Sequence, residues 1–489
     1  MPESRFVFTT KKRILFFLVW LLAVVFFTQK IDHTILFRRF VTHRTFTGDE
    51  PKYFRMVHSL WKDGDLDLSD LWMDGQKIKE SEDRYREKGQ RRFGDFYIVG
   101  INGGIFPIHM PGLAFWILPP FSLDMAVSPP VADNAPSNLA FLPRSLFFTR
   151  LWFLLTAVAV LGLLLRLCIW FTRSLIVSSL LLFFFISYSP FPEYSVKIYP
   201  GVTVAAFTLM ALNGIFSPFK KHRLFNDGMI VLGIGFLPWF HQRFIPLSLG
   251  LLLAFFYQRV GIKGNLKKIL PVCLLLGLMS LPYFFYFYSI TGSLSPLSIS
   301  AVYGKVFARL STFLLGFFGH LLSEREGIFW WYPWTLFSLA GIFWSWKEKK
   351  HETLLLLMVM VPYYLLISIG IPWSGGTLPP GRFLLPLFPV FLLFCGTAIS
   401  NLVRRFSWSK TSLYTFLIIF IFFYRRFRFI DLDFSYSSMT SDDVVRMVAS
   451  MGILFCFFLL IYGGNKIFFT RQERNIWNVF SFMKKKPGS

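Results

Sequence analysis

Two adjacent carboxylates, Asp49 and Glu50, stand directly before Pro51 and shortly after the first hydrophobic run of the chain. A carboxylate held at a membrane surface can act as a general base that takes a proton from a hydroxyl group. Because two adjacent side chains do not both point into one cavity, we expect Asp49 to be the base. Glu50 would orient the acceptor or hold the start of a helix. The simpler alternative is a solvated helix cap, which acidic residues before proline often form.

Basic side chains could supply the positive charge that stabilises a departing phosphate. Arg243 and Arg382 are expected at the outer ends of hydrophobic runs, and a guanidinium pairs with phosphate oxygens in a bidentate manner. Lys197 and Arg150 are weaker candidates of the same kind. The alternative for these residues is that they extend to the membrane interface and contact only water and lipid headgroups.

Two further residues are candidates for contact with a substrate. Tyr53 lies within the helix that Pro51 is expected to begin, and His109 lies in the same long loop. A single histidine in a loop is commonly an ordinary hydrogen-bonding residue, so both interpretations of His109 stay open.

No metal site is expected, although Asp63, Asp65 and Asp67 resemble the start of a calcium-binding loop. The EF-hand pattern fails because Leu68 occupies the position that requires glycine and Asp74 the position that prefers glutamate. A divalent cation is an open alternative, and no cofactor is certain. The cysteines form neither a CxxC pair nor a cluster with histidine, which argues against a zinc site or a disulfide framework: Cys168, Cys273, Cys395 and Cys456.

Two helices in the long loop would position these residues. Over Asp49–Trp61 the apolar residues recur at helical spacing, and Pro51 in the first turn is a helix start signal. This pattern fits a helix that lies on the membrane surface. Gly112–Leu118 is apolar enough for a second surface helix or a re-entrant helix, which we expect Pro119 and Pro120 to end.

The composition predicts the class of protein, because 54% of the residues are hydrophobic and only 16% are charged, far from the average of soluble domains. The predicted fold is an all-α polytopic membrane protein with about 12 transmembrane helices (range 10–13). The interrupted segment 228–257 could instead be one broken helix, although the charge pattern favours two. The predicted spans are 14–28, 146–165, 174–189, 200–216, 228–240, 244–257, 269–289, 328–346, 353–371, 383–403, 412–424 and 447–463.

The charge is distributed unevenly along the chain. The segment 29–145 holds 15 Lys+Arg and 15 Asp+Glu, so the net charge of +24 resides in the remainder. Basic residues collect in cytoplasmic loops of membrane proteins, which explains this excess better than binding to nucleic acid. We therefore expect both termini in the cytoplasm, 1–28 as the N-terminus and first helix, and 29–145 as a large first extracytoplasmic loop. Residues 146–463 would form the multi-helix domain, and 464–489 a basic cytoplasmic tail.

Four stretches resemble bacterial membrane glycosyltransferases of the GT-C superfamily, which includes protein mannosyltransferases and lipid A aminoarabinose transferases. The most specific is Gly48-Asp49-Glu50-Pro51-Lys52-Tyr53, which runs into His58-Ser59-Leu60 and Asp63–Leu68. The supporting stretches are His109–Leu113, Glu326-Gly327-Ile328 with Tyr332-Pro333, and Trp373–Gly376 with Pro380–Phe383.

The resemblance implies a multi-helix enzyme of the bacterial inner membrane that takes a sugar from a polyprenyl-phosphate carrier. It places the essential acidic residue in the loop after the first helix, facing the periplasm. The reaction would be a hexosyl or pentosyl transfer to a hydroxyl of a lipid, a glycan or a protein, among membrane lipids and without nucleic acid. The alternatives are a transporter or flippase of lipid-linked saccharide, which would not need Asp49, and a glycan ligase or polymerase.

Overall fold

The computed structural model describes residues 10–31, 49–71, 92–93, 97–130, 141–217, 223–260, 269–296, 298, 310–323, 327–369 and 380–405. The expected spans 412–424 and 447–463 and the basic tail 464–489 lie outside the described residues. Within the described part, the chain is mainly helical.

Most helices belong to the apolar part of the chain. In chain order they are α1 (Thr10–Thr28), α6 (Phe147–Thr172), α7 (Leu175–Ser187), α8 (Phe191–Tyr194), α9 (Pro200–Ile215), α10 (Arg223–Gly235), α11 (Leu237–Phe240), η4 (Gln242–Phe244), α12 (Ile245–Val260), α13 (Leu270–Thr291), α15 (Leu310–Leu322), α16 (Ile328–Trp331), η6 (Pro333–Thr335), α17 (Leu336–Glu348), α18 (Lys350–Ile369), η7 (Arg382–Leu387) and α19 (Phe388–Arg405).

Four segments in the described residues are long and apolar enough to cross a membrane: Phe147–Thr172, Leu270–Thr291, Lys350–Ile369 and Arg382–Leu402. Several shorter apolar helices accompany them, including Ile14–Thr28 and Pro200–Ile215. The count of about 12 spans therefore stays a prediction. The sequence analysis missed α15, and it joined into one span the stretch that forms α16, η6 and α17.

The segment 228–257 forms two main helices, as the charge pattern favoured. α10 ends at Gly235, and α12 begins at Ile245 after the short turns α11 and η4. His241 interrupts the helical path because its backbone is extended, with φ −173° and ψ 146°. This break places His241 and Arg243 in a non-helical connection, where their side chains can face a site.

The long loop contains two helices and a small sheet. α3 (Glu50–Lys62) confirms the first predicted helix, and α5 (Gly112–Val127) packs against both α3 and α6. The expectation that Pro119 and Pro120 end this second helix is wrong, because both lie inside α5. Packing on two neighbouring helices outweighs the local cost of proline in the helix interior.

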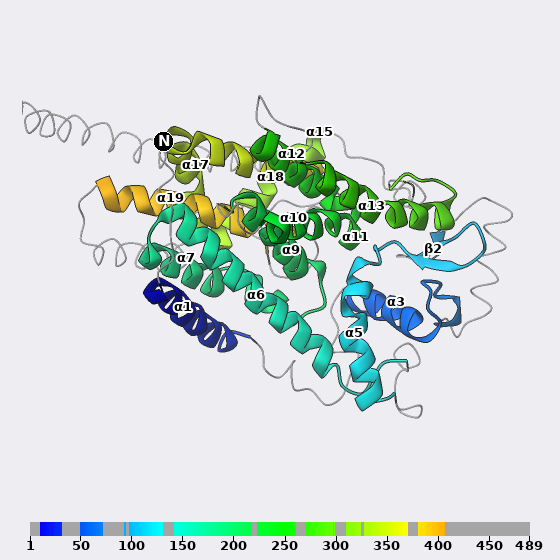
Figure 1. The fold of residues 1–489 in the computed structure, drawn as a ribbon. Helices are drawn as coiled ribbons and strands as arrows, with labels where there is room; N and C mark the ends of the chain where they lie inside the picture. The colour runs from blue at the N-terminus through cyan, green and yellow to red at the C-terminus, as the bar shows by residue number, and fades with distance from the viewer. Residues whose placement is uncertain are drawn as a thin grey trace, which may run out of the picture.

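The all-α prediction is also wrong in this loop. β1 (Arg92–Phe93), β2 (Tyr97–Val99) and β3 (Ile105–Pro107) form an antiparallel sheet in the order β1-β2-β3. The strands are two or three residues long, too short to show a two-residue alternation in the sequence. Figure 1 shows α3, α5 and β2 grouped at one end of the structure, where α6 and α13 also end.

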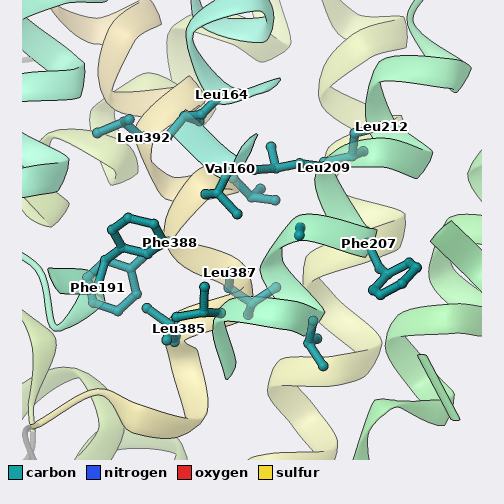
Figure 2. Close-up of a cluster of buried hydrophobic side chains, with 14 of the residues drawn as sticks. Val160, Leu164, Phe191, Phe207, Leu209, Leu212, Leu385, Leu387, Phe388 and Leu392 are labelled. Atoms are coloured by element: carbon teal, nitrogen blue, oxygen red, sulfur yellow. The ribbon is translucent and has the colours of Figure 1, made fainter. Parts of the chain in front are cut away.

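A buried apolar core holds η7 in place between the membrane helices. Figure 2 shows Leu385 and Leu387 of η7 among side chains of α6, α9 and α19. Both leucines are at most 1% exposed. The approach to α9 is close, because a Cβ atom added at Gly201 would lie 2.8 Å from a methyl group of Leu385. Arg382, the first residue of η7, is therefore attached to a closely packed part of the fold.

Candidate functional site

The carboxylate of Asp49 is the centre of the site. Its Oδ1 accepts a hydrogen bond from Lys52 Nζ at 2.7 Å, and its Oδ2 accepts one from Arg382 Nη2 at 2.7 Å. His109 Nε2 lies 3.4 Å from Oδ1. Although Asp49 is the residue that precedes α3, its side chain makes no helix-capping hydrogen bond. The Asp49 side chain therefore contacts Lys52, Arg382 and His109 and does not cap the helix.

Arg382 reaches Asp49 from the other end of the sequence because of the turn before η7. Gly381 adopts φ +77° and ψ 13°, a left-handed conformation that a glycine adopts without strain. Tyr332 fixes this turn by donating a hydrogen bond from its hydroxyl to the Pro380 carbonyl at 2.9 Å. The guanidinium of Arg382 also lies 4.4 Å from the ring centroid of Tyr199, which limits its orientation.

Glu50 has a different role from Asp49. It is 2% exposed, and its Oε1 accepts a hydrogen bond from the backbone N–H of Ile198 at 2.8 Å. This bond ties the first turn of α3 to the segment that precedes α9. The two adjacent carboxylates thus bind different partners, Ile198 for Glu50 and Arg382 for Asp49.

His109 and Tyr53 lie together beside Asp49. Their rings stack with centroids 5.4 Å apart and an interplanar angle of 28°. The ring of His241 lies 6.2 Å from that of His109. Gly112 permits this arrangement, because a Cβ atom there would meet the backbone of Trp239 at 2.5 Å. The start of α5 therefore fits directly against α11.

Arg243 faces the same region from the connection between α11 and α12. Its guanidinium carbon lies 4.4 Å from the ring centroid of Phe383, and that of Arg382 lies 5.8 Å from the same ring. The two arginines thus share one aromatic ring. Within the described residues Arg243 forms no ion pair, and its buried Nε has no hydrogen-bond partner. It is a cation without a counter-charge in direct contact.

The surroundings of Asp49 set its protonation state. Burial alone would raise its pKa, but the contact with His109 and the charges of Arg382 and Lys52 outweigh burial and hold the pKa well below the ordinary value. Burial lowers the pKa of His109, although Asp49 opposes this. At neutral pH the site therefore contains an ionised Asp49 and a neutral His109.

His241 is held in a single tautomer. Its Nδ1 accepts a hydrogen bond from the backbone N–H of Arg243 at 3.1 Å, so a neutral ring carries its proton on Nε2. Burial and the nearby charge of Arg243 lower its pKa well below the ordinary value. His241 therefore adds a hydrogen-bond donor to the site and no net charge.

The site has an excess of positive charge. In the described part of the chain, Lys52, Arg243 and Arg382 are the cations that act on Asp49. Even with Glu50 counted, three cations face two carboxylates. Uncompensated charge is costly in a buried environment. This arrangement is suited to binding an anion.

Lys197 is less central than the sequence analysis suggested. Its Nζ forms an ion pair with Glu193, and it lies 5.9 Å from the ring centroid of Tyr194. Tyr194 in turn packs on Tyr199 with centroids 5.6 Å apart, and Tyr199 is the ring beneath Arg382. Lys197 is thus linked to Arg382 through the contacts of Tyr194 and Tyr199, at the edge of the site.

The aspartates that follow α3 bind groups of their own loop. Asp65 Oδ1 accepts hydrogen bonds from Ser59 Oγ at 2.9 Å and from the Asp67 N–H at 3.1 Å. Asp67 Oδ1 accepts from the N–H of Ser69 at 3.0 Å and of Ile105 at 2.9 Å. These bonds fasten the loop to β3. The open alternative of a divalent cation at Asp63, Asp65 and Asp67 stays untested.

The sequence analysis missed three parts of the site. Lys52 stands one turn after Asp49, and its spacing could have identified it. His241 was noted only as an interruption of a hydrophobic run. Tyr199 and Phe383, which flank the arginines, gave no signal, because aromatic residues are abundant throughout this chain.

No family model matches the chain, and no curated protein matches its sequence. Three solved structures are similar in fold. The Archaeoglobus fulgidus oligosaccharyltransferase in the apo form is 12% identical, with a TM-score of 0.48 over 85% of this chain and 54% of that chain. ArnT from Cupriavidus metallidurans bound to undecaprenyl phosphate is 13% identical, with a TM-score of 0.45 over 84% and 63%.

The third structure is the oligosaccharyltransferase AglB from Archaeoglobus fulgidus in complex with an inhibitory peptide and a dolichol-phosphate. It is 12% identical, with a TM-score of 0.45 over 95% of this chain and 56% of that chain. The chain therefore matches less than two thirds of the length of these proteins.

Proposed function

We propose that this chain is an integral-membrane glycosyltransferase that moves a sugar from a polyprenyl-phosphate carrier to a hydroxyl of a lipid, a glycan or a protein. The observation that carries the proposal is the pairing of Asp49 with Arg382 at 2.7 Å, in a site where Arg243 adds a second guanidinium. The reaction requires a base for the acceptor and positive charge for the departing phosphate. The site contains both.

In the proposed reaction, the acceptor oxygen attacks the anomeric carbon of the sugar. Asp49 takes the proton of the acceptor hydroxyl as the new carbon–oxygen bond forms. The bond between the anomeric carbon and the phosphate oxygen breaks, and its electron pair leaves with the polyprenyl phosphate. Direct displacement of this kind inverts the anomeric centre.

The arginines would stabilise the departing phosphate. Guanidinium groups stay protonated and match phosphate oxygens in geometry, so Arg243 and Arg382 need no proton transfer to act. Tyr53 is 1% exposed and lies close enough to both arginines and Asp49 for their charges to act on its hydroxyl. In this proposal the Tyr53 hydroxyl binds the sugar or the phosphate between them.

The charge pattern of the sequence supports a site on the outer face of the membrane. For a bacterial protein, the charge rule puts both termini in the cytoplasm and the loop 29–145 in the periplasm. Asp49, Tyr53 and His109 belong to that loop. We therefore propose that transfer takes place at the periplasmic face of the inner membrane.

The test is sugar transfer by the purified protein in lipid nanodiscs. A panel of polyprenyl-phosphate hexoses and pentoses would be supplied with lipid, glycan and peptide acceptors, and released polyprenyl phosphate would be measured. Consumption of at least one donor by the wild type, and its loss in Asp49→Asn, is the expected result. Movement of a lipid-linked saccharide across the bilayer without donor consumption would instead support a transporter. Reaction only with a diphosphate-linked glycan would support a ligase or polymerase.

A further inference from the structure

We propose that Arg382 exchanges its partner during the reaction: it pairs with Asp49 before the donor binds, and with the phosphate of the donor afterwards. The exchange would release Asp49 as a base only when a donor is present. This inference rests on the proposed function, since it describes how the same site is regulated. The evidence is the geometry of four side chains.

With both of its oxygens bound to cations, the carboxylate of Asp49 is held too tightly to act as a base. Asp49 accepts hydrogen bonds from two cations, each at 2.7 Å, one through each carboxylate oxygen. A proton acceptor needs an oxygen lone pair that faces the acceptor hydroxyl. While Arg382 and Lys52 occupy both oxygens, the carboxylate is a weak base and is poorly placed to receive a proton.

Arg382 is the partner that a phosphate can remove. It comes from η7, far from Asp49 in the sequence, and its guanidinium carbon lies 4.4 Å from the ring centroid of Tyr199. This cation–π contact would hold the guanidinium beside Asp49 while a phosphate replaces the carboxylate as its partner. Arg243 lies over the same Phe383 ring that Arg382 contacts. A phosphate that binds Arg243 would therefore be adjacent to Arg382.

Lys52 keeps Asp49 in place when Arg382 leaves. It stands three residues after Asp49, in the first turn of the helix that Asp49 precedes, so the pair is maintained by local geometry. The backbone also contributes, since the N–H of Lys52 donates to the Asp49 carbonyl at 3.0 Å. After the exchange, Oδ1 stays bound to Lys52, and Oδ2 becomes available to the acceptor hydroxyl.

The exchange predicts an effect that a purely structural ion pair would not produce. If Asp49 and the phosphate compete for one guanidinium, removing the carboxylate should strengthen phosphate binding while it abolishes transfer. The probe is a short-chain polyprenyl phosphate without a sugar, titrated into the full-length protein in nanodiscs. We expect Asp49→Asn to bind it at least about tenfold more tightly than the wild type.

The matched control is Glu193→Gln, which removes one negative charge near Lys197, at the edge of the site. It should leave the affinity within about twofold of the wild type. In an Arg382→Gln background, the gain from Asp49→Asn should disappear, because the effect acts through Arg382. Asp49→Ser serves as a second neutral variant if Asp49→Asn lowers the yield of folded protein.

The outcomes separate this inference from the proposed function. If neither the wild type nor Asp49→Asn binds polyprenyl phosphate, the proposed donor is wrong. If the wild type binds it and the neutral variants bind equally or more weakly, the donor stands and the exchange is wrong. A gain that persists in the Arg382→Gln background also overturns the exchange, because the competition would then involve another group.

Discussion

Asp49 Oδ2 and Arg382 Nη2 are 2.7 Å apart, although 333 positions separate the two residues in the sequence. The pair joins the first long loop to the turn that begins η7. It brings a candidate base and a candidate phosphate ligand into one site.

The first prediction concerns the base. Asp49→Asn keeps the size of the side chain and removes the negative charge, so transfer should fall by about 10²- to 10⁴-fold. The protein should still fold, because the amide oxygen can accept a hydrogen bond from Lys52 or Arg382. The measurement is the initial rate of donor consumption at equal protein concentration. Transfer at the wild-type rate would remove Asp49 from the mechanism.

Glu50 should behave differently from Asp49. Glu50→Gln retains an oxygen that accepts the Ile198 N–H, so transfer should fall by less than about tenfold. Glu50→Ala leaves that buried N–H unpaired and should cost about 1–3 kcal/mol of stability. Thermal unfolding and transfer rates of both variants would be compared. A larger loss of transfer in Glu50→Gln than in Asp49→Asn would reverse the two roles.

Arg243 should contribute to donor binding through its geometry as well as its charge. Arg243→Lys keeps a positive charge but loses the planar group that lies over Phe383 at 4.4 Å. Because lysine cannot bind phosphate in a bidentate manner, we expect the donor KM to rise or kcat to fall by about tenfold or more. Arg259→Lys is the control, since Arg259 pairs with Asp227 and lies in another part of the fold.

Local sequence patterns indicated the helix that carries the candidate residues, but they did not indicate which distant residues contact Asp49. Pro51 and the helical spacing correctly indicated α3, whereas the separate roles of Asp49 and Glu50 stay a prediction. The contacts of Asp49 with Arg382 and His109 depend on how distant elements pack, which no local pattern contains. The continuation of α5 through Pro119 and Pro120 was missed because tertiary packing overrode local preference. The strands were missed because two or three residues are too few to show an alternating pattern.

The pH dependence of stability should reflect the buried histidines of the site, of which His109 is the one in contact with Asp49. The pKa of His109 is lowered in the folded protein, while the unfolded value is about 6.5. Below that value the unfolded chain takes up a proton that the folded site resists, so stability should fall as the pH decreases from 7 to 5. His109→Gln should weaken this slope. An unchanged slope would indicate that folding does not shift the pKa of His109.

The turn at Gly381 should be sensitive to a single methyl group. Gly381 has φ +77°, and a Cβ atom there would lie 3.2 Å from Ile328 and 3.3 Å from Phe388. Gly381→Ala should therefore destabilise the protein by about 1–2 kcal/mol and displace Arg382, which directly follows it. The control is Gly228→Ala in α10, where the added Cβ atom meets nothing within 4 Å and alanine favours the helix.

We expect Gly381→Ala to lower both the unfolding temperature and the affinity for polyprenyl phosphate. The Gly228→Ala variant should keep the affinity and be equally or more stable. If Gly381→Ala kept wild-type affinity, the left-handed turn would not be what positions Arg382.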